Sequence, residues 1–257
     1  MEKLTEISIK SKYISVLPDG KLLREVSYGG SQEWVRPRDD KGKKLELGRW
    51  QKLKKPNVIA DCGCGLVASE DVLTYLEKKD MTAGRGEFDY NVTAYQSMLM
   101  DADFHDFPVL PYGGLSGILM ALNMNRIFRQ KGMKYKARWI NNPKKMFARM
   151  QEMLEADIPV IFSAGPGIFK KKKFIRLFVE DGNFKNGKRF KKSVSFRNHY
   201  VTCTGILTWR DASGKEKRML RVSSWGRKYY LDFDEYYNYV ESTDNWLFSN
   251  MLYIRKK

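Results

Sequence analysis

Apolar residues recur along the first part of the chain with the spacing of helices. Between residues 64 and 76 they cover most of a helix circumference, at Leu66, Val67, Ala68, Val72, Leu73, Tyr75 and Leu76. A helix that is apolar on nearly every side is buried in its domain, so this segment is predicted to be the central helix. Further helices are predicted at 91–100 and, after the glycine-rich entry Gly113–Gly117, through about Gln130, with Gly132 ending the helix. Another is predicted from Asn142-Pro143 onward, where asparagine caps and proline takes the first position.

Later segments carry the short apolar and β-branched runs that are typical of strands. The predicted strands are Ile158–Ser163, Tyr200–Ile206, Met219–Val222, Tyr229–Leu231 and Leu247–Ile254, with a helical turn at 232–239. Residues 6–10 and 13–16 also look like strands, and after the turn Pro18-Asp19-Gly20 a strand is expected to return at 22–28. The predicted fold class is α+β, with a β-rich N-terminal extension, residues 1–50, and a main domain, residues 51–257.

The chain is strongly basic, with 47 lysines and arginines against 30 acidic residues and a net charge of +17. Such a charge suggests attraction to an acidic partner, and a solvated basic surface explains it equally well. The densest basic region runs from Lys170 to Arg197, with phenylalanines interleaved among its lysines. That pattern can bind single-stranded nucleic acid by charge and stacking, but alternating strands with basic outer faces are the favoured interpretation.

Cys64 and His199 carry the candidate catalytic chemistry. Cys64 lies in the first turn of the predicted central helix, where the partial positive charge of a helix N-terminus favours the reactive thiolate. Gly65 allows a substrate to approach the backbone closely. His199 begins a predicted strand far along the chain, and the next strand ends in Ser223-Ser224-Trp225-Gly226. The alternative role for Cys64 is that of a small buried hydrophobe.

These motifs, in this order, resemble those of papain-like cysteine peptidases, in particular the bacterial branch that processes double-glycine bacteriocin leaders. Cys64-Gly65-Leu66-Val67-Ala68 is similar to the nucleophile motif, His199 to Gly205 to the histidine strand, and Ser223-Ser224-Trp225-Gly226 to Asn-Ser-Trp-Gly. The resemblance covers residues 55–257. It implies a papain-like fold, in which the cysteine-bearing helix packs on an antiparallel sheet, and a cysteine peptidase or related thiol hydrolase acting on a peptide or amide bond. It implies no cofactor and no metal.

The resemblance also assigns roles to individual residues. Cys64 is the nucleophile, His199 is the base, and Ser223 stands where papain-like enzymes have the Asn or Asp that orients the imidazole. Asn57 is the side-chain amide closest to the place of the family's oxyanion glutamine, although it sits one residue early. The residues that would contact substrate are Gly65 and Trp225. The serine and the displaced amide also fit an alternative, an inactive papain-like scaffold that binds an acidic peptide, a cell-wall polymer or nucleic acid.

The remaining cysteines and His105 carry less chemistry. Three cysteines do not make a disulfide framework; Cys62 is expected in the loop before the central helix, and Cys203 in a strand core. The acidic residues around His105 are interpreted as a polar turn rather than a metal site, because no second histidine lies nearby in the sequence. No apolar run reaches the length of a membrane span and no signal peptide opens the given chain, so a cytoplasmic location is expected unless a leader was trimmed.

Overall fold

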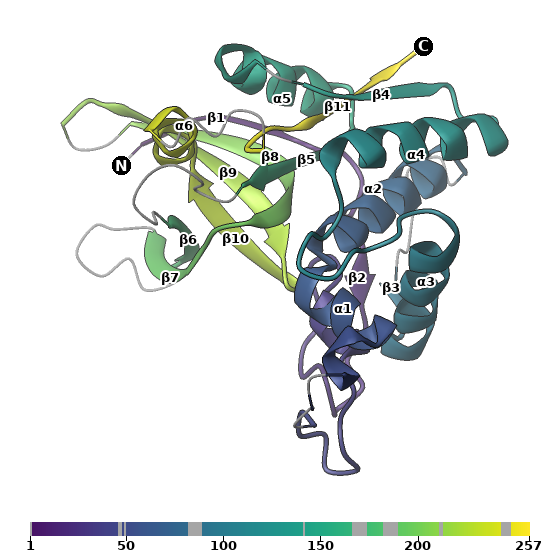
Figure 1. Cartoon of the computed structure of the whole chain (residues 1–257). Helices are drawn as coiled ribbons and strands as arrows, with labels where there is room; N and C mark the ends of the chain where they lie inside the picture. The colour runs from purple at the N-terminus through teal and green to yellow at the C-terminus, as the bar shows by residue number, and fades with distance from the viewer. Residues whose placement is uncertain are drawn as a thin grey trace. The chain divides into compact units, whose positions relative to one another are not determined.

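A computed structural model describes residues 2–45, 48, 50–81, 89–140, 142–165, 174–181, 190–210, 213–242 and 248–257 (Figure 1). The chain divides into two compact units. The first, called the sheet unit, comprises Met1–Lys10, Arg138–Ser223 and Lys228–Arg255. The second, called the helical unit, comprises Ser11–Ala137, Ser224–Arg227 and Lys256–Lys257. The fold is mixed α and β with an antiparallel sheet, which agrees with the predicted α+β class.

Seven strands form the main sheet, in the order β1-β8-β9-β10-β6-β7 with β5 also paired to β8 (Figure 1). They are β1 (Glu2–Ser8), β5 (Val160–Ala164), β6 (Ile175–Glu180), β7 (Phe190–Phe196), β8 (His199–Arg210), β9 (Glu216–Ser224) and β10 (Arg227–Asp232). Strands β1, β5 and β9 all run antiparallel to β8. Nine of the twelve residues of β8 are buried, and the strand pairs with β1, β5 and β9, so His199 begins an interior strand of the sheet.

The remaining elements around the sheet are η3 (Pro143–Lys145), α5 (Met146–Glu155), α6 (Phe233–Ser242), and the paired strands β4 (Tyr135–Trp139) and β11 (Leu252–Lys256). Hydrogen bonds attach α6 to the end of β5. The Tyr236 hydroxyl donates to the carbonyl of Ser163 at 2.7 Å, and the Tyr239 hydroxyl donates to the carbonyl of Gly165 at 2.6 Å. Polar tips of buried tyrosines thus satisfy backbone groups where the strand ends.

The helical unit is built around α2 (Cys64–Met81). Its other elements are β2 (Ser15–Val16), η1 (Gln32–Val35), η2 (Gln51–Leu53), α1 (Lys55–Cys62), β3 (Asp89–Tyr90), α3 (Val92–His105) and α4 (Gly117–Gln130). The apolar residues that predicted a central helix are all buried, which confirms that prediction. Asn91 caps α3 by accepting the N–H of Ala94 at 2.7 Å. Helix α4 ends at Gln130, as predicted, with Gly132 following at φ 66°.

Two expectations for the N-terminal residues differ from the structure. No strand forms at 22–28, because the carboxylate of Asp19 accepts the backbone N–H groups of Lys21, Leu22 and Leu23 and folds the segment into a turn. The predicted domain boundary at residue 50 also matches no limit of either unit. Strand β1 pairs with β8 and so joins residues 1–10 to the sheet unit, whereas residues 11–50 group with the helices.

Asp71 is a buried carboxylate within α2. Its Oδ2 accepts the backbone N–H of Gly30 at 2.9 Å and the hydroxyl of Tyr13 at 3.3 Å, and its Oδ1 accepts the hydroxyl of Tyr95 at 2.6 Å. These bonds hold the N-terminal loop and α3 to the central helix. Burial raises the pKa of Asp71 to about 6, while the hydrogen bonds oppose that rise.

We predict that Asp71 contributes a decrease in the free energy of unfolding as pH rises from about 4 to about 6, and that Asp71→Asn removes this contribution. Folding raises the pKa of Asp71 from 3.8 to about 6, so the folded state binds the proton more tightly. The contribution is therefore complete below the lower pKa and lost above the higher one. Urea titrations at a series of pH values measure it.

Glu70→Gln is the matched control for this experiment. Burial and the nearby carboxylate of Asp106 raise the pKa of Glu70 to about 8. Glu70 therefore contributes a decrease in the free energy of unfolding that continues above about pH 6. Glu70→Gln should remove this contribution, and Asp71→Asn should leave it unchanged. Parallel stability curves for wild type and Asp71→Asn below about pH 6 would contradict the role given to Asp71.

Candidate active site

The candidate nucleophile lies at a tight junction between two helices of the helical unit. Helix α1 ends at Cys62 and α2 begins at Cys64, so Gly63 serves both helices. The Gly63 N–H donates to the carbonyl of Ile59 at 2.7 Å, and the Gly63 carbonyl accepts the N–H of Val67 at 3.0 Å. A Cβ at position 63 would lie 2.4 Å from the Ile59 oxygen. Glycine therefore permits the junction that makes Cys64 the first residue of α2.

Cys64 is partly exposed and starts an 18-residue helix. The partial positive charge at this helix end favours an anion, so the predicted environment for a nucleophilic thiolate is present. Cys62 was expected in a loop, and that expectation is wrong, because Pro56 sits at the start of α1 and the helix continues through Cys62. A helix C-terminus carries partial negative charge, so Cys64 occupies the better position for a thiolate.

The predicted Trp-Gly motif forms the tight turn between β9 and β10. Trp225 and Gly226 have φ values of 49° and 72°, the left-handed pair of a type I′ hairpin turn. Gly226 donates its N–H to the carbonyl of Gly30 at 2.8 Å, and its carbonyl accepts the N–H of Tyr28 at 2.9 Å. A Cβ on Gly226 would come within 2.8 Å of the Trp34 ring. Since Gly30 also binds Asp71, this turn is connected to the central helix.

Asn57 and Gly65 also lie in the helical unit. Asn57 is buried in α1, and its amide donates to the carbonyl of Gln51 at 2.7 Å, while its Oδ1 is buried with no hydrogen-bond partner among the described residues. One amide hydrogen is therefore engaged in holding η2 to α1. Gly65 is the buried second residue of α2, and its carbonyl accepts the Ser69 hydroxyl at 2.8 Å. Their predicted roles toward substrate remain predictions.

His199 is the buried first residue of β8 and pairs with Ala164 of β5. Asn198 before it has a φ of 49°, a conformation that asparagine tolerates better than most residues. The Phe196 ring lies edge-on to the imidazole, with the ring centroids 5.6 Å apart. Burial lowers the pKa of His199 to about 3, so the ring is neutral near pH 7 unless an anion faces it.

The sheet register separates Ser223 from His199. Ser223 is buried and lies directly opposite Thr202 in the β8–β9 pair. Residues opposite each other share a face, and successive residues alternate between faces. Thr202 is three residues after His199, so Ser223 falls on the face away from the imidazole. Ser224, the next residue of β9, falls on the face that His199 shares.

The predicted site residues thus come from both units. Cys64, Asn57, Gly65 and Trp225 belong to the helical unit, and His199 and Ser223 belong to the sheet unit. The pairing of Cys64 with His199 stays a prediction. Sequence reasoning missed Gly63 and Asp71, although the Cys-Gly-Cys run and a carboxylate inside an apolar helix were available signals. It placed Cys203 correctly, since that thiol is buried in β8.

His105 lies at the end of α3, where its Nδ1 is 3.0 Å from a carboxylate oxygen of Asp101. Both side chains are more than half exposed. Within the described residues, no group of three or more His, Cys, Asp or Glu side chains is placed to hold a metal ion. The contact is that of an exposed helical pair one turn apart.

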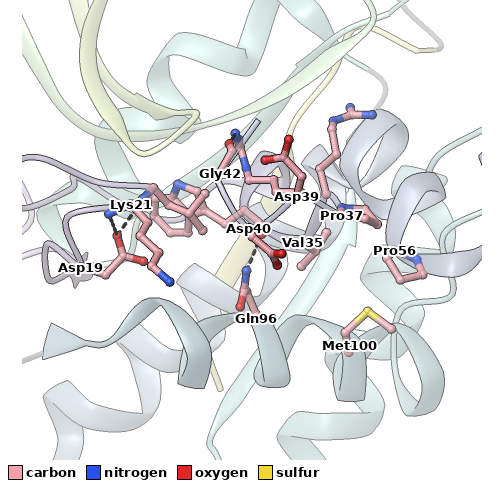
Figure 2. Close-up of a pocket in the computed structure, with 14 residues that line it drawn as sticks. Asp19, Lys21, Val35, Pro37, Asp39, Asp40, Gly42, Pro56, Gln96 and Met100 are labelled. Atoms are coloured by element: carbon pink, nitrogen blue, oxygen red, sulfur yellow. Dashed lines mark hydrogen bonds between the residues drawn. The ribbon is translucent and has the colours of Figure 1, made fainter. Parts of the chain in front are cut away.

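The helical unit also holds a pocket of 520 Å³ (Figure 2). Gln96 and Met100 reach it from α3 and Pro56 from α1, while Asp19 and Asp39 lie on its loop side (Figure 2). Both carboxylates accept backbone N–H groups of their own loops. The other charged residues that line it are Lys21, Arg36, Arg38 and Asp40. Opposite charges are mixed in this pocket, so its lining favours no charge of ligand.

Seven of the eleven lysines and arginines in the basic region predicted at Lys170–Arg197 lie outside the described residues, within 170–173 and 182–189. Its described part supports the strand interpretation, because β6 and β7 pair antiparallel. Lys191 and Lys192 are exposed on β7, and the Arg197 guanidinium stacks on the Phe174 ring at 4.9 Å. Binding of an anionic partner here remains a prediction.

Among the described residues, no helix has the length and apolar character needed to cross a bilayer. A scan against protein-family models finds no match to this chain, and a search of curated proteins finds no significant match. The resemblance to papain-like peptidases therefore rests on the sequence motifs around Cys64, His199 and Trp225.

We predict that Gly63→Ala displaces the helix junction and lowers the free energy of unfolding by about 1–3 kcal/mol, the usual cost of forcing an extra carbon into a packed site. It should also slow alkylation of Cys64, because the thiol leaves its place at the start of α2. Denaturant titration and the rate of iodoacetamide labelling measure the two effects. Gly48→Ala is the control, since among the described residues the nearest atom to a Cβ there is the Gln51 Oε1 at 3.8 Å. Equal behaviour of the two variants would contradict this account.

Proposed function

We propose that the protein is a thiol hydrolase of the papain-like type that cleaves a peptide or related amide bond. The observation that carries the proposal is the position of Cys64, a partly exposed thiol that begins a buried central helix. His199, at the start of a buried strand, supplies the base. The order of cysteine helix, histidine strand and Trp-Gly turn matches the family that the sequence resembles.

In the proposed mechanism the Cys64 sulfur attacks the carbonyl carbon after His199 accepts its proton. The tetrahedral intermediate collapses, the carbon–nitrogen bond breaks, and His199 returns the proton to the leaving amine. Water then adds to the thioester with His199 again accepting a proton. Collapse of this second intermediate releases the carboxylic acid and regenerates the thiol. The backbone N–H of Cys64, at the positive end of α2, donates to the oxyanion.

The proposed oxyanion role of Asn57 uses its second amide hydrogen, because the first is engaged by the carbonyl of Gln51. Asn57→Ala therefore removes a contact between η2 and α1 as well as any oxyanion donor. The backbone N–H of Cys64 remains the principal donor in this proposal. A glutamine six residues before the nucleophile, as in papain-like enzymes, has no counterpart, since position 58 is valine.

The residue that orients the imidazole is Ser224 in this proposal, in place of Ser223. The register puts Ser223 opposite Thr202, and alternation gives Ser224 the face of His199. A serine hydroxyl accepts an imidazole N–H, although it is shorter than the amide of papain-like enzymes. Weaker orientation lowers turnover without removing it, because nucleophile and base still meet.

Binding without turnover is the second candidate function. The engaged amide of Asn57 and the register of Ser223 both depart from a complete papain-like site. The net charge of +17 favours an acidic partner for such a scaffold, whether peptide, cell-wall polymer or nucleic acid. Catalytic assays of matched variants separate the two functions.

We predict that iodoacetamide at mildly acidic pH labels Cys64 much faster than Cys62 or Cys203. The helix N-terminus and a base favour the thiolate at Cys64, whereas burial raises the pKa of Cys203 to about 12. Cys64→Ala should remove the fast labelling, and Cys62→Ala and Cys203→Ala should retain it. Mass spectrometry of timed samples gives the rates, and comparable slow rates at Cys62 and Cys64 would count against an activated nucleophile.

We predict that Ser224→Ala lowers kcat/KM of peptide or ester hydrolysis by about 10- to 100-fold, as expected for loss of an orienting contact. Ser223→Ala is the matched control and should change kcat/KM by less than about threefold. The assay uses a panel of peptides and esters, with Cys64→Ala as the background. Wild-type hydrolysis equal to the Cys64→Ala background in folded protein would favour the binding scaffold. A larger loss from Ser223→Ala would overturn the register argument alone.

A further inference from the structure

A second pocket of the helical unit gathers lysines with little acidic compensation. It has a volume of 460 Å³ and lies where α4 ends, with Lys131, Lys134, Lys256 and Lys257 among its lining residues. Glu77 is the one acidic side chain in that lining. Pockets of this size hold small organic ligands. The four lysine ammonium groups repel one another around this pocket. A bound anion would offset that repulsion and so would bind favourably.

The walls of this pocket are held by the backbone. The Lys257 N–H donates to the carbonyl of Lys134 at 2.9 Å, which fixes the two segments side by side. Their lysines consequently stay close together despite repulsion between like charges on neighbouring strands. Leu76 and Tyr135, both buried, form an apolar part of the lining.

Glu77 neutralises one of the four lysines. Its carboxylate pairs with Lys131 at 2.7 Å. Among the described residues, no carboxylate forms an ion pair with Lys134, Lys256 or Lys257, and all three are exposed. The pocket thus retains three ammonium groups that an incoming anion can reach.

Capping of α4 does not account for these lysines. Carbonyls in the last turn of the helix already accept backbone N–H groups. The carbonyl of Ile127 accepts the N–H of Lys131 at 2.9 Å, and the carbonyl of Phe128 accepts the N–H of Met133 at 2.8 Å. The helix end is therefore satisfied without any ammonium group. Surface charges of the two signs are usually interspersed, whereas these lysines are clustered. Departures of this kind from what favours folding are expected at functional sites.

We propose that this pocket binds a small ligand carrying two or more adjacent phosphate groups. Lysine ammonium groups are point charges that suit phosphate oxygens from several directions. The site is separate from Cys64 in sequence and does not depend on the proposed hydrolase function.

Isothermal titration with inorganic tripolyphosphate tests the proposal at low salt, where charge–charge attraction is least screened. Wild type should bind about one equivalent. Lys134→Gln combined with Lys256→Gln should weaken binding about tenfold or more. Lys191→Gln combined with Lys192→Gln removes the same charge from exposed strand β7 and should change the Kd by less than about twofold.

Glu77→Gln provides a test that a purely structural lysine cluster would not satisfy. It releases Lys131 from its ion pair and removes the acidic lining residue, so affinity for tripolyphosphate should rise about threefold or more. Melting temperatures of all variants verify that they fold. Absence of saturable binding of tripolyphosphate below about 1 mM would overturn the proposal. Equal weakening of binding in the two double variants would also overturn it, as would an affinity in Glu77→Gln that is unchanged or lower.

Discussion

The buried carboxylate of Asp71 connects the N-terminal loop and α3 to the central helix of the helical unit. An ionised group in an apolar core is costly unless hydrogen bonds surround it, and this carboxylate receives three, from Gly30, Tyr13 and Tyr95. Each donor comes from a different part of the chain, so the carboxylate fixes the N-terminal loop and α3 against α2. The carbonyl of Gly30 in turn receives the N–H of Gly226. The helix that carries Cys64 and the Trp-Gly turn are therefore stabilised by one connected polar network.

Two local geometries then position the candidate chemistry. At Gly63 one residue ends α1 and starts α2, which gives Cys64 the first position of a long buried helix. In the sheet, β8 pairs with three strands, and its first residue is His199. Both groups are thus carried by rigid elements rather than by loops, the arrangement that holds catalytic side chains with least freedom. The same rigidity suits a binding scaffold, which is why chemical reactivity at Cys64 separates the two functions.

Much of the fold could be predicted because its signals are local. Continuous apolar residues predicted α2, and β-branched runs predicted β8 and β9. Other features depend on contacts that the sequence pattern does not contain. Position 63 requires glycine because of an Ile59 carbonyl that approaches it only in the folded chain. The expected strand at 22–28 gives way to a turn around Asp19. The pairing of Ser223 with Thr202 depends on strand register, and a shift of one residue exchanges the faces.

The central claim, that Cys64 and His199 act as a pair, is tested most directly by the charge of the His199 ring. Burial lowers the pKa of this imidazole to about 3, and a facing thiolate would raise it by stabilising the imidazolium. NMR of the two histidine rings in labelled protein reports their charge, and exposed His105 serves as the internal reference. At about pH 6 the account predicts an imidazolium at His199 in wild type and a neutral ring in Cys64→Ala. A neutral His199 ring in both proteins would contradict it.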